Sequence, residues 1–90
     1  MARSLVLTSK SSGVFAIAAG VRQELRLNVP KPIDVPAGRV KVSFNQGEPR
    51  VVCEVWVELK EGDQRALVFG PDGTVMALGP EGRSALGCNR

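Results

Sequence analysis

The chain has 90 residues, of which 43% are hydrophobic and 23% are charged, and its formal net charge is +3. This length and balance are typical of a single globular domain spanning residues 1–90, and they exclude a disordered chain. The 10 glycines and 6 prolines indicate many turns, which favours short strands over long helices.

The side chains on which most enzymes and metal sites depend are scarce. The chain has no histidine, which removes the commonest general base and zinc ligand, and its two cysteines alone make a poor metal site. It contains no Gly-x-Ser-x-Gly turn and no glycine-rich phosphate loop before a helix. Glu54 and Glu58 would lie about 13 Å apart on an extended strand, farther than paired-carboxylate hydrolysis requires. We therefore expect a protein that is not an enzyme and binds no cofactor or metal.

The first third of the chain contains several short segments with strand character. Residues 4–9 are the first candidate strand. Residues 14–19 are apolar throughout, so they form either a strand buried on both faces or part of a helix. In that helix Gly20 would be internal, at a cost of about 1 kcal/mol, and we therefore favour two strands, the second over residues 21–29. Residues 30–36 contain three prolines and are predicted to cross outside a sheet interior.

The most regular pattern lies in residues 50–59. Its odd positions are all apolar and its even positions are mostly charged, which predicts a strand with one face in a core. Trp56 falls among the charged positions, so its side chain is expected to point away from the core. Residues 39–45 alternate in the same way, and antiparallel pairing of the two segments is predicted to place Phe44 opposite Val51.

The same pairing is predicted to place Arg39 opposite Trp56. Residues 64–69 are expected to pair with the other side of the tryptophan strand, which would bring two further apolar side chains onto its outer face. The resulting candidate partner-binding residues are Trp56, Val52, Leu67, Phe69, Arg39, Glu58 and Arg65. This cluster is either the inner face of a sandwich, covered by the N-terminal strands, or an exposed patch that docks a protein partner around the tryptophan.

The tail contains a near repeat, because residues 70–79 and 79–87 both begin with Gly-Pro-acid-Gly. This motif suits a type I turn and indicates two strand reversals. Cys53 lies on the apolar side of its strand and Cys88 lies in the tail. A small buried hydrophobe is the first interpretation of Cys53, and a bridge between the two cysteines stays open.

The N-terminal residues lack the hydrophobic segment of a secretion signal, and no segment approaches membrane-spanning length. We therefore expect cytoplasmic synthesis with reduced thiols and no membrane association. Residues 1–50 carry eight basic and three acidic residues, whereas residues 51–90 carry four basic and six acidic residues. These charges either interleave in the folded domain, mark a polyanion partner, or let subunits pack basic side to acidic side.

The polyanion interpretation gives an alternative function, a basic β module that binds single-stranded nucleic acid. Its basic residues would be Arg22, Arg26, Arg39 and Lys41, with Trp56 and Phe69 as stacking platforms. A small inhibitor that masks a partner enzyme is a further alternative.

Together these patterns predict an all-β fold, a small antiparallel sandwich or barrel of seven or eight short strands. In length, in its Gly-Pro-acid-Gly turns and in its lack of catalytic groups, the chain resembles the small all-β accessory proteins of phage particles, such as capsid cement or decoration proteins. The resemblance implies a non-catalytic virion assembly protein that binds neighbouring subunits in many copies or as a homo-oligomer. The sequence leaves the partner, the oligomeric state and the strand order open.

Overall fold

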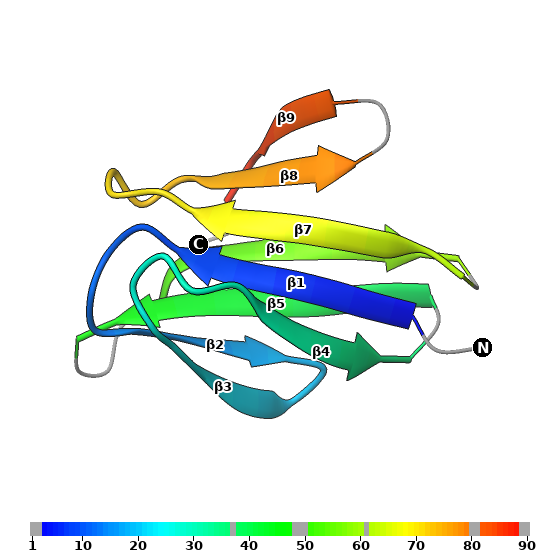
Figure 1. Cartoon of the computed structure of the whole chain (residues 1–90), viewed down its shortest axis with the longest axis horizontal. Coiled ribbons are helices and arrows are strands. Elements are labelled where there is room, and N and C mark those ends of the chain that lie inside the picture. Colours follow the sequence, from blue (N-terminus) through cyan, green and yellow to red (C-terminus); the bar gives the residue numbers. More distant parts are fainter. Residues whose placement is uncertain (1–2, 37, 48–50, 61, 80–81, 89–90) are drawn as a thin grey trace.

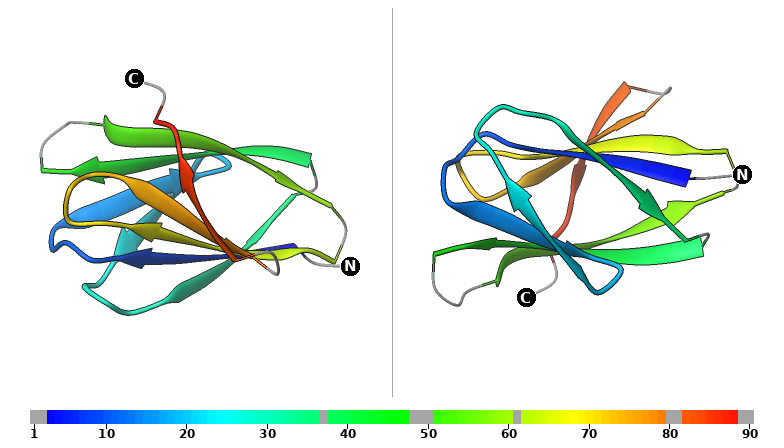
Figure 2. Two further views of the ribbon diagram at one scale, coloured as in Figure 1. Left: turned by 90° about the horizontal axis from the view of Figure 1, so that it is seen from above. Right: turned by 60° about the horizontal axis from the view of Figure 1, so that its bottom comes forward.

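A computed structural model of the chain describes residues 3–36, 38–47, 51–60, 62–79 and 82–88. These residues form nine strands and no helix, arranged as two sheets packed into a sandwich (Figure 1, Figure 2). The predicted all-β class is confirmed, with nine strands in place of seven or eight. Over the described ranges there is no helix with the length and apolar character needed to cross a bilayer.

The five-stranded sheet, here called sheet A, has the order β4-β1-β7-β8-β9. Its strands are β1 (Arg3–Ser9), β4 (Lys31–Val35), β7 (Gln64–Phe69), β8 (Val75–Gly79) and β9 (Gly82–Leu86). β1 runs parallel to β7, which is an exception to the predicted antiparallel arrangement. β4 replaces the predicted proline-rich crossing, and its edge position suits Pro32 because an edge strand needs ladder donors on one side only.

The four-stranded sheet, sheet B, has the order β3-β2-β5-β6 and is antiparallel throughout. Its strands are β2 (Val14–Ala18), β3 (Val21–Leu25), β5 (Gly38–Gln46) and β6 (Val51–Leu59). The preference for two strands over a helix in the first third of the chain is thus confirmed. Ala19 and Gly20 have φ values of 50° and 80°, which close β2 and β3 into a tight two-residue hairpin.

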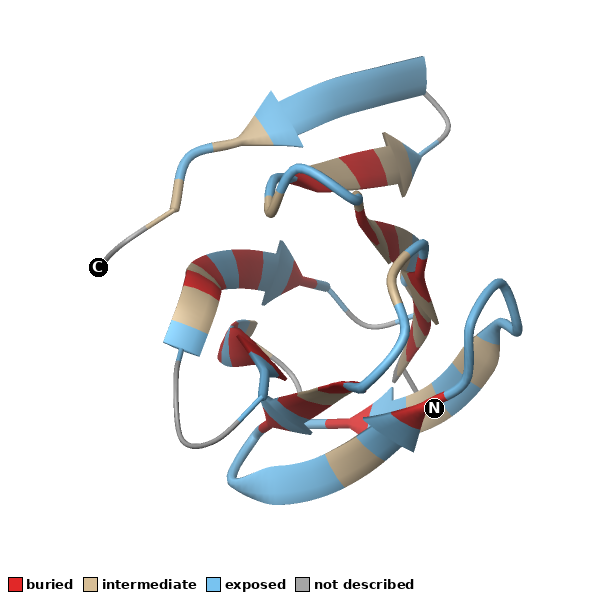
Figure 3. Ribbon diagram, turned by 90° about the vertical axis from the view of Figure 1, so that its left-hand side faces the viewer, coloured by how far each residue is buried: buried red, intermediate tan, exposed pale blue. Residues whose placement is uncertain are grey.

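The core lies between the two sheets and is filled by alternate residues of the strands (Figure 3). Phe44 of β5 and Phe69 of β7 are both fully buried, and their rings stack with centroids 5.3 Å apart. Phe44 and Val55 face this core, whereas the side chain of Trp56 is 42% exposed on the opposite face of sheet B. The predicted outward direction of the tryptophan is therefore confirmed.

The pairing of β5 with β6 differs from the predicted register by two residues. Phe44 lies opposite Cys53 instead of Val51. The pair Asn45 and Val51 already differs by one residue from the predicted register, and the extra residue Val52 in β6 adds the second. Such a bulge moves the ladder along without any local sequence signal. Because the shift beyond the bulge is even, residues 53–59 keep their predicted faces. Before the bulge the faces are exchanged, since Val51, predicted to face the core, is 48% exposed and Val52, predicted to face outward, packs against the core.

The predicted pairing of residues 64–69 with β6 is wrong. These residues form β7, which lies in sheet A between β1 and β8. Leu67 and Phe69 consequently face the core and are fully buried. A short connection usually joins antiparallel neighbours, but here the chain passes from one sheet to the other, and the parallel partner β1 lies far earlier in the sequence.

A disulfide joins Cys53 of β6 to Cys88, which follows β9, with the two Cα atoms 4.9 Å apart. The expectation of reduced thiols is therefore wrong for this structure, and the bridge that the sequence left open is formed. Cys53 is fully buried, as its apolar strand position predicted. The bond ties the edge strand of sheet B to the chain that leaves the edge strand of sheet A.

Candidate functional site

The outward side chains of β5 and β6 form a surface of mixed charge around the only tryptophan. Successive side chains of a strand point to opposite faces, so the charged positions of both strands gather on the side away from the core. We call this group the Trp56 surface, and its members are Trp56, Arg39, Lys41, Glu54 and Glu58.

Two cations flank the indole ring. The guanidinium carbon of Arg39 lies 4.5 Å from the ring centroid, and the Nζ atom of Lys41 lies 5.8 Å from it. Lys41 is the direct cross-strand neighbour of Trp56, so the predicted position of Arg39 is corrected to a diagonal one. Cation–π attraction of this kind contributes about 0.5–1 kcal/mol at an exposed site, and it holds the indole against the sheet.

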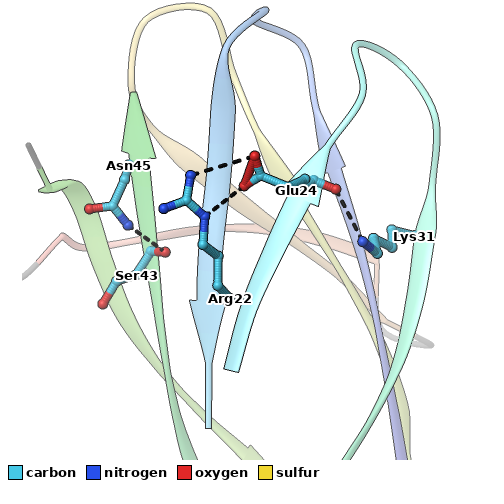
Figure 4. A network of polar contacts seen from close by, with 5 residues as sticks. All are labelled: Arg22, Glu24, Lys31, Ser43 and Asn45. Carbon is cyan, nitrogen blue, oxygen red and sulfur yellow. Dashed lines mark hydrogen bonds and ion pairs between the residues drawn. The ribbon is translucent and has the colours of Figure 1, made fainter. Parts of the chain in front are cut away.

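The carboxylate of Glu54 is satisfied within the same sheet. The hydroxyl of Ser43 donates to its Oε2 atom at 3.1 Å, and Lys41 Nζ lies 3.9 Å from the same oxygen. Ser43 and Asn45 are buried although they face outward, and Asn45 Nδ2 donates to the Ser43 carbonyl at 3.2 Å (Figure 4). This network fixes the middle of the surface and neutralises much of its charge.

A second cation–aromatic pair lies on β2 and β3 of the same face. The guanidinium carbon of Arg22 lies 3.7 Å from the centroid of Phe15, and its Nε atom donates to Glu24 Oε2 at 2.8 Å. That hydrogen bond lowers the pKa of Glu24, and Lys31 Nζ donates to the Glu24 carbonyl at 3.2 Å (Figure 4). The sequence placed Phe15 in a wholly buried run, so its outward position was missed.

Four of the seven predicted partner-binding residues do not join the Trp56 surface. Leu67 and Phe69 are core residues, so the predicted apolar cluster of one shared face is wrong. Val52 packs against the core and lies close to Gly73. A Cβ atom added to this glycine would lie 3.1 Å from Val52 Cγ1. Arg65 is exposed on β7 of sheet A. The three residues that the structure brings together are Trp56, Arg39 and Glu58.

The chemistry available at this surface is stacking, hydrogen bonding and charge pairing. In the part of the chain that the structure describes, no group of three or more cysteine or carboxylate side chains could hold a metal ion. Of the two aromatic platforms predicted for a nucleic-acid partner, Phe69 is buried and only Trp56 is exposed. Arg22 and Lys41, two of the four predicted basic contacts, are paired with glutamates.

Sequence reasoning missed the outer face of sheet A, which is apolar. Its half-buried residues come from β1, β7 and β8, and they are Val6, Ala66, Val68, Met76 and Leu78. Two shallow hollows of about 340 and about 290 Å³ lie on this face. The strands β7 and β8 are apolar at both alternating sets of positions, a pattern that indicates burial without saying which side faces the core.

Comparisons with protein-family models, with curated proteins and with solved structures found no match for the chain. Function must therefore be inferred from the two outer faces of the sandwich and from the residues that form them.

Proposed function

We propose that this protein is a non-catalytic interaction module that docks a protein partner through the Trp56 surface. The observation that carries the proposal is the outward indole, 42% exposed, with Arg39 stacked on its ring at 4.5 Å. Tryptophan and arginine are enriched at the energetic centres of protein interfaces, because both offer a large contact area together with a polar group. The remaining charged side chains suit the polar rim of such an interface.

The rigidity of the surface supports the same conclusion. Trp56 and Arg39 come from paired strands, and the hydrogen bond of Ser43 to Glu54 links the same two strands at 3.1 Å. A contact residue that is already held in place loses little conformational freedom when a partner binds, so more of its contact energy appears as affinity. The acids Glu54 and Glu58 disfavour a polyanion on this face, because a phosphate backbone would meet both carboxylates.

We propose further that the setting is a virus particle, in which many copies bind neighbouring subunits as a capsid cement or decoration protein. What supports this setting is the resemblance in length and turn composition, together with a compact sandwich of two sheets. An exposed aromatic on the edge strand β6 suits repeated contacts with identical neighbours in a symmetric assembly.

The test is mass determination of the native complex, isolated from the particles or cells that contain the protein, with and without nuclease. We expect a multi-copy protein complex of constant stoichiometry that nuclease does not alter. Trp56→Ala should lower incorporation at least tenfold. Val29→Ala is the matched control, because Val29 is similarly exposed, at 50%, but lies outside the Trp56 surface.

Three results would contradict the proposal in different ways. Normal incorporation of Trp56→Ala would remove the tryptophan as an anchor. A complex that nuclease dissolves would favour the nucleic-acid module, and a one-to-one complex with a single enzyme would favour the inhibitor.

A further inference from the structure

The outer face of sheet A carries a hollow whose walls combine apolar and basic groups. Its floor is apolar and comes from β7 and β8, whereas its rim contains two cations, one from the turn after β1 and one from β9. The residues that line it are Lys10, Val68, Met76, Leu78 and Arg83, and its volume is about 290 Å³. We call this site the Lys10–Arg83 hollow.

The two cations of the hollow lack the partners that the cations of sheet B possess. Within the described ranges, neither Lys10 Nζ nor the Arg83 guanidinium forms an ion pair or a side-chain hydrogen bond. The backbone N–H of Lys10 donates to the Phe69 carbonyl at 2.8 Å, which fixes this residue beside the end of β7. Uncompensated positive charge beside an apolar floor is complementary to a ligand that is both acidic and apolar.

The neighbouring strand β9 shows which shape such a ligand would take. β9 is the edge of sheet A, and no other described strand pairs with its outer side. Its residues are exposed except for the half-buried Leu86 (Figure 3). An unpaired edge presents backbone donors and acceptors that an extended segment of another chain can pair with. The opposite edge, β4, is less suited to this because it contains Pro32.

We infer that sheet A binds an extended, acidic and apolar segment of a partner protein, which adds to β9 as a further strand and reaches the Lys10–Arg83 hollow. Arg83 and Ala85 share the outer face of β9, opposite Leu78 and Met76 respectively. An added strand would lie about 4.8 Å from β9, with alternate side chains on that same outer face. A carboxylate there would meet Arg83, and an apolar side chain could cross the small Ala85 to contact Met76.

This inference is independent of the proposed docking through Trp56, because it uses the other sheet. The probe is a heptapeptide with blocked ends and the sequence Thr-Asp-Thr-Leu-Thr-Asp-Thr. The control peptide has lysine in place of each aspartate. We expect two-dimensional NMR to show shifts of the β9 amides and of the Met76 and Leu78 methyl groups. The Trp56 indole signal should stay in place, and raising the salt concentration should weaken binding.

Charge reversal tests the rim of the hollow. Arg83→Glu and Lys10→Glu should each weaken binding of the aspartate peptide at least tenfold. Arg26→Glu is the matched control, since it makes the same charge change on the exposed connection between β3 and β4 and should leave binding unchanged. Emission from Trp56, which lies on the other sheet, reports whether each variant is folded. Two independent rim variants keep the test valid if one of them does not fold.

Four results would overturn the inference. The first is binding of the lysine peptide as tight as that of the aspartate peptide. The second is a set of NMR shift changes confined to the Trp56 surface. A third is absence of peptide binding together with binding to phosphatidylglycerol vesicles, which would indicate a membrane surface as the occupant. The fourth is concentration-dependent self-association that protects the β9 amides, which would make a second copy of this chain the occupant.

Discussion

The two outer faces of the sandwich differ in how their charges are satisfied. On sheet B, Arg22 and Lys41 have carboxylate partners and Arg39 lies on an indole ring. On sheet A, Lys10 and Arg83 border an apolar hollow with no described partner. Internal pairing fixes the geometry of a surface, whereas unpaired charge makes a surface selective for a partner of the opposite sign. We therefore expect this small domain to have one outer face with fixed, paired charges and another that selects a partner by its charge.

The largest expected effect is on stability, and it compares a residue of the core with a residue of an outer face. Phe69→Ala should lower the free energy of unfolding by about 3–5 kcal/mol, because it leaves a cavity against Phe44 between the two sheets. Trp56→Ala should lower the free energy of unfolding by less than half of this amount, since the indole ring is already partly in water. Urea denaturation measures both values, and equal costs would mean that Trp56 is a core residue.

The second prediction concerns the covalent link between the two sheets. The disulfide closes a loop with a sequence separation of 35, so Cys88→Ala should lower the free energy of unfolding by about 2–4 kcal/mol. Cys88 is half-buried, and its substitution removes the bond with little loss of packing. In a reducing agent the wild type and the variant should unfold at similar urea concentrations. A difference that persists there would point to packing of the tail as the cause.

The third prediction tests the contrast between the two faces directly with an apolar anionic dye. Anilinonaphthalene sulfonate should bind the Lys10–Arg83 hollow, because the dye combines an aromatic body with a sulfonate. Met76→Gln and Arg83→Glu should each lower the bound fluorescence about fivefold, which corresponds to about 1 kcal/mol. Arg39→Ala should leave the fluorescence unchanged, and a loss with that variant would move the dye to sheet B.

A smaller effect is expected from the cation–π contact on sheet B. A double-mutant cycle with Arg39→Ala and Trp56→Ala should give a coupling of about 0.5–1 kcal/mol in unfolding experiments. The same cycle with Arg26→Ala in place of Arg39→Ala should give a coupling near zero. A zero value for the first pair would show that Arg39 does not hold the indole in solution.

The smallest effect is expected for a substitution of Ala19 in the hairpin that joins β2 to β3. Ala19 has a φ of 50°, which favours glycine over a residue with a Cβ atom. Ala19→Gly should raise the free energy of unfolding by about 0.5 kcal/mol, whereas Gly20→Ala should lower it by about 1 kcal/mol. Thermal denaturation of both variants checks the opposite signs, and a loss of stability in Ala19→Gly would contradict the strain at this turn.

What the sequence could predict follows from the difference between the sheets. In β6 one alternating set of positions is wholly apolar and the other contains two glutamates, and this difference is sufficient to orient Trp56 away from the core. In β7 both Leu67 and Val68 are apolar, so alternation could not decide which of them faces inward. The residues of β7 were therefore assigned to the wrong sheet and the wrong face.

Two further features had no local signal. The parallel pairing of β1 with β7 joins segments that are distant in sequence, and no turn connects them. The bulge at Val52 shifts the β5–β6 register without a glycine to mark it. The contact of Arg22 with Phe15 depended on the β2–β3 pairing, and it could have been found once β2 was assigned as a strand with two faces.

The position of β1 between β4 and β7 has a consequence for biosynthesis. A nascent chain exposes Leu5 and Leu7 early, yet their strand acquires both of its neighbours only after β7 has left the ribosome. Until then one side of the strand has no ladder partner, although all four strands of the opposing sheet B have already been synthesised. We therefore expect sheet A to be completed late, and a chain cut off before Gln64 to be a substrate for chaperones or proteases.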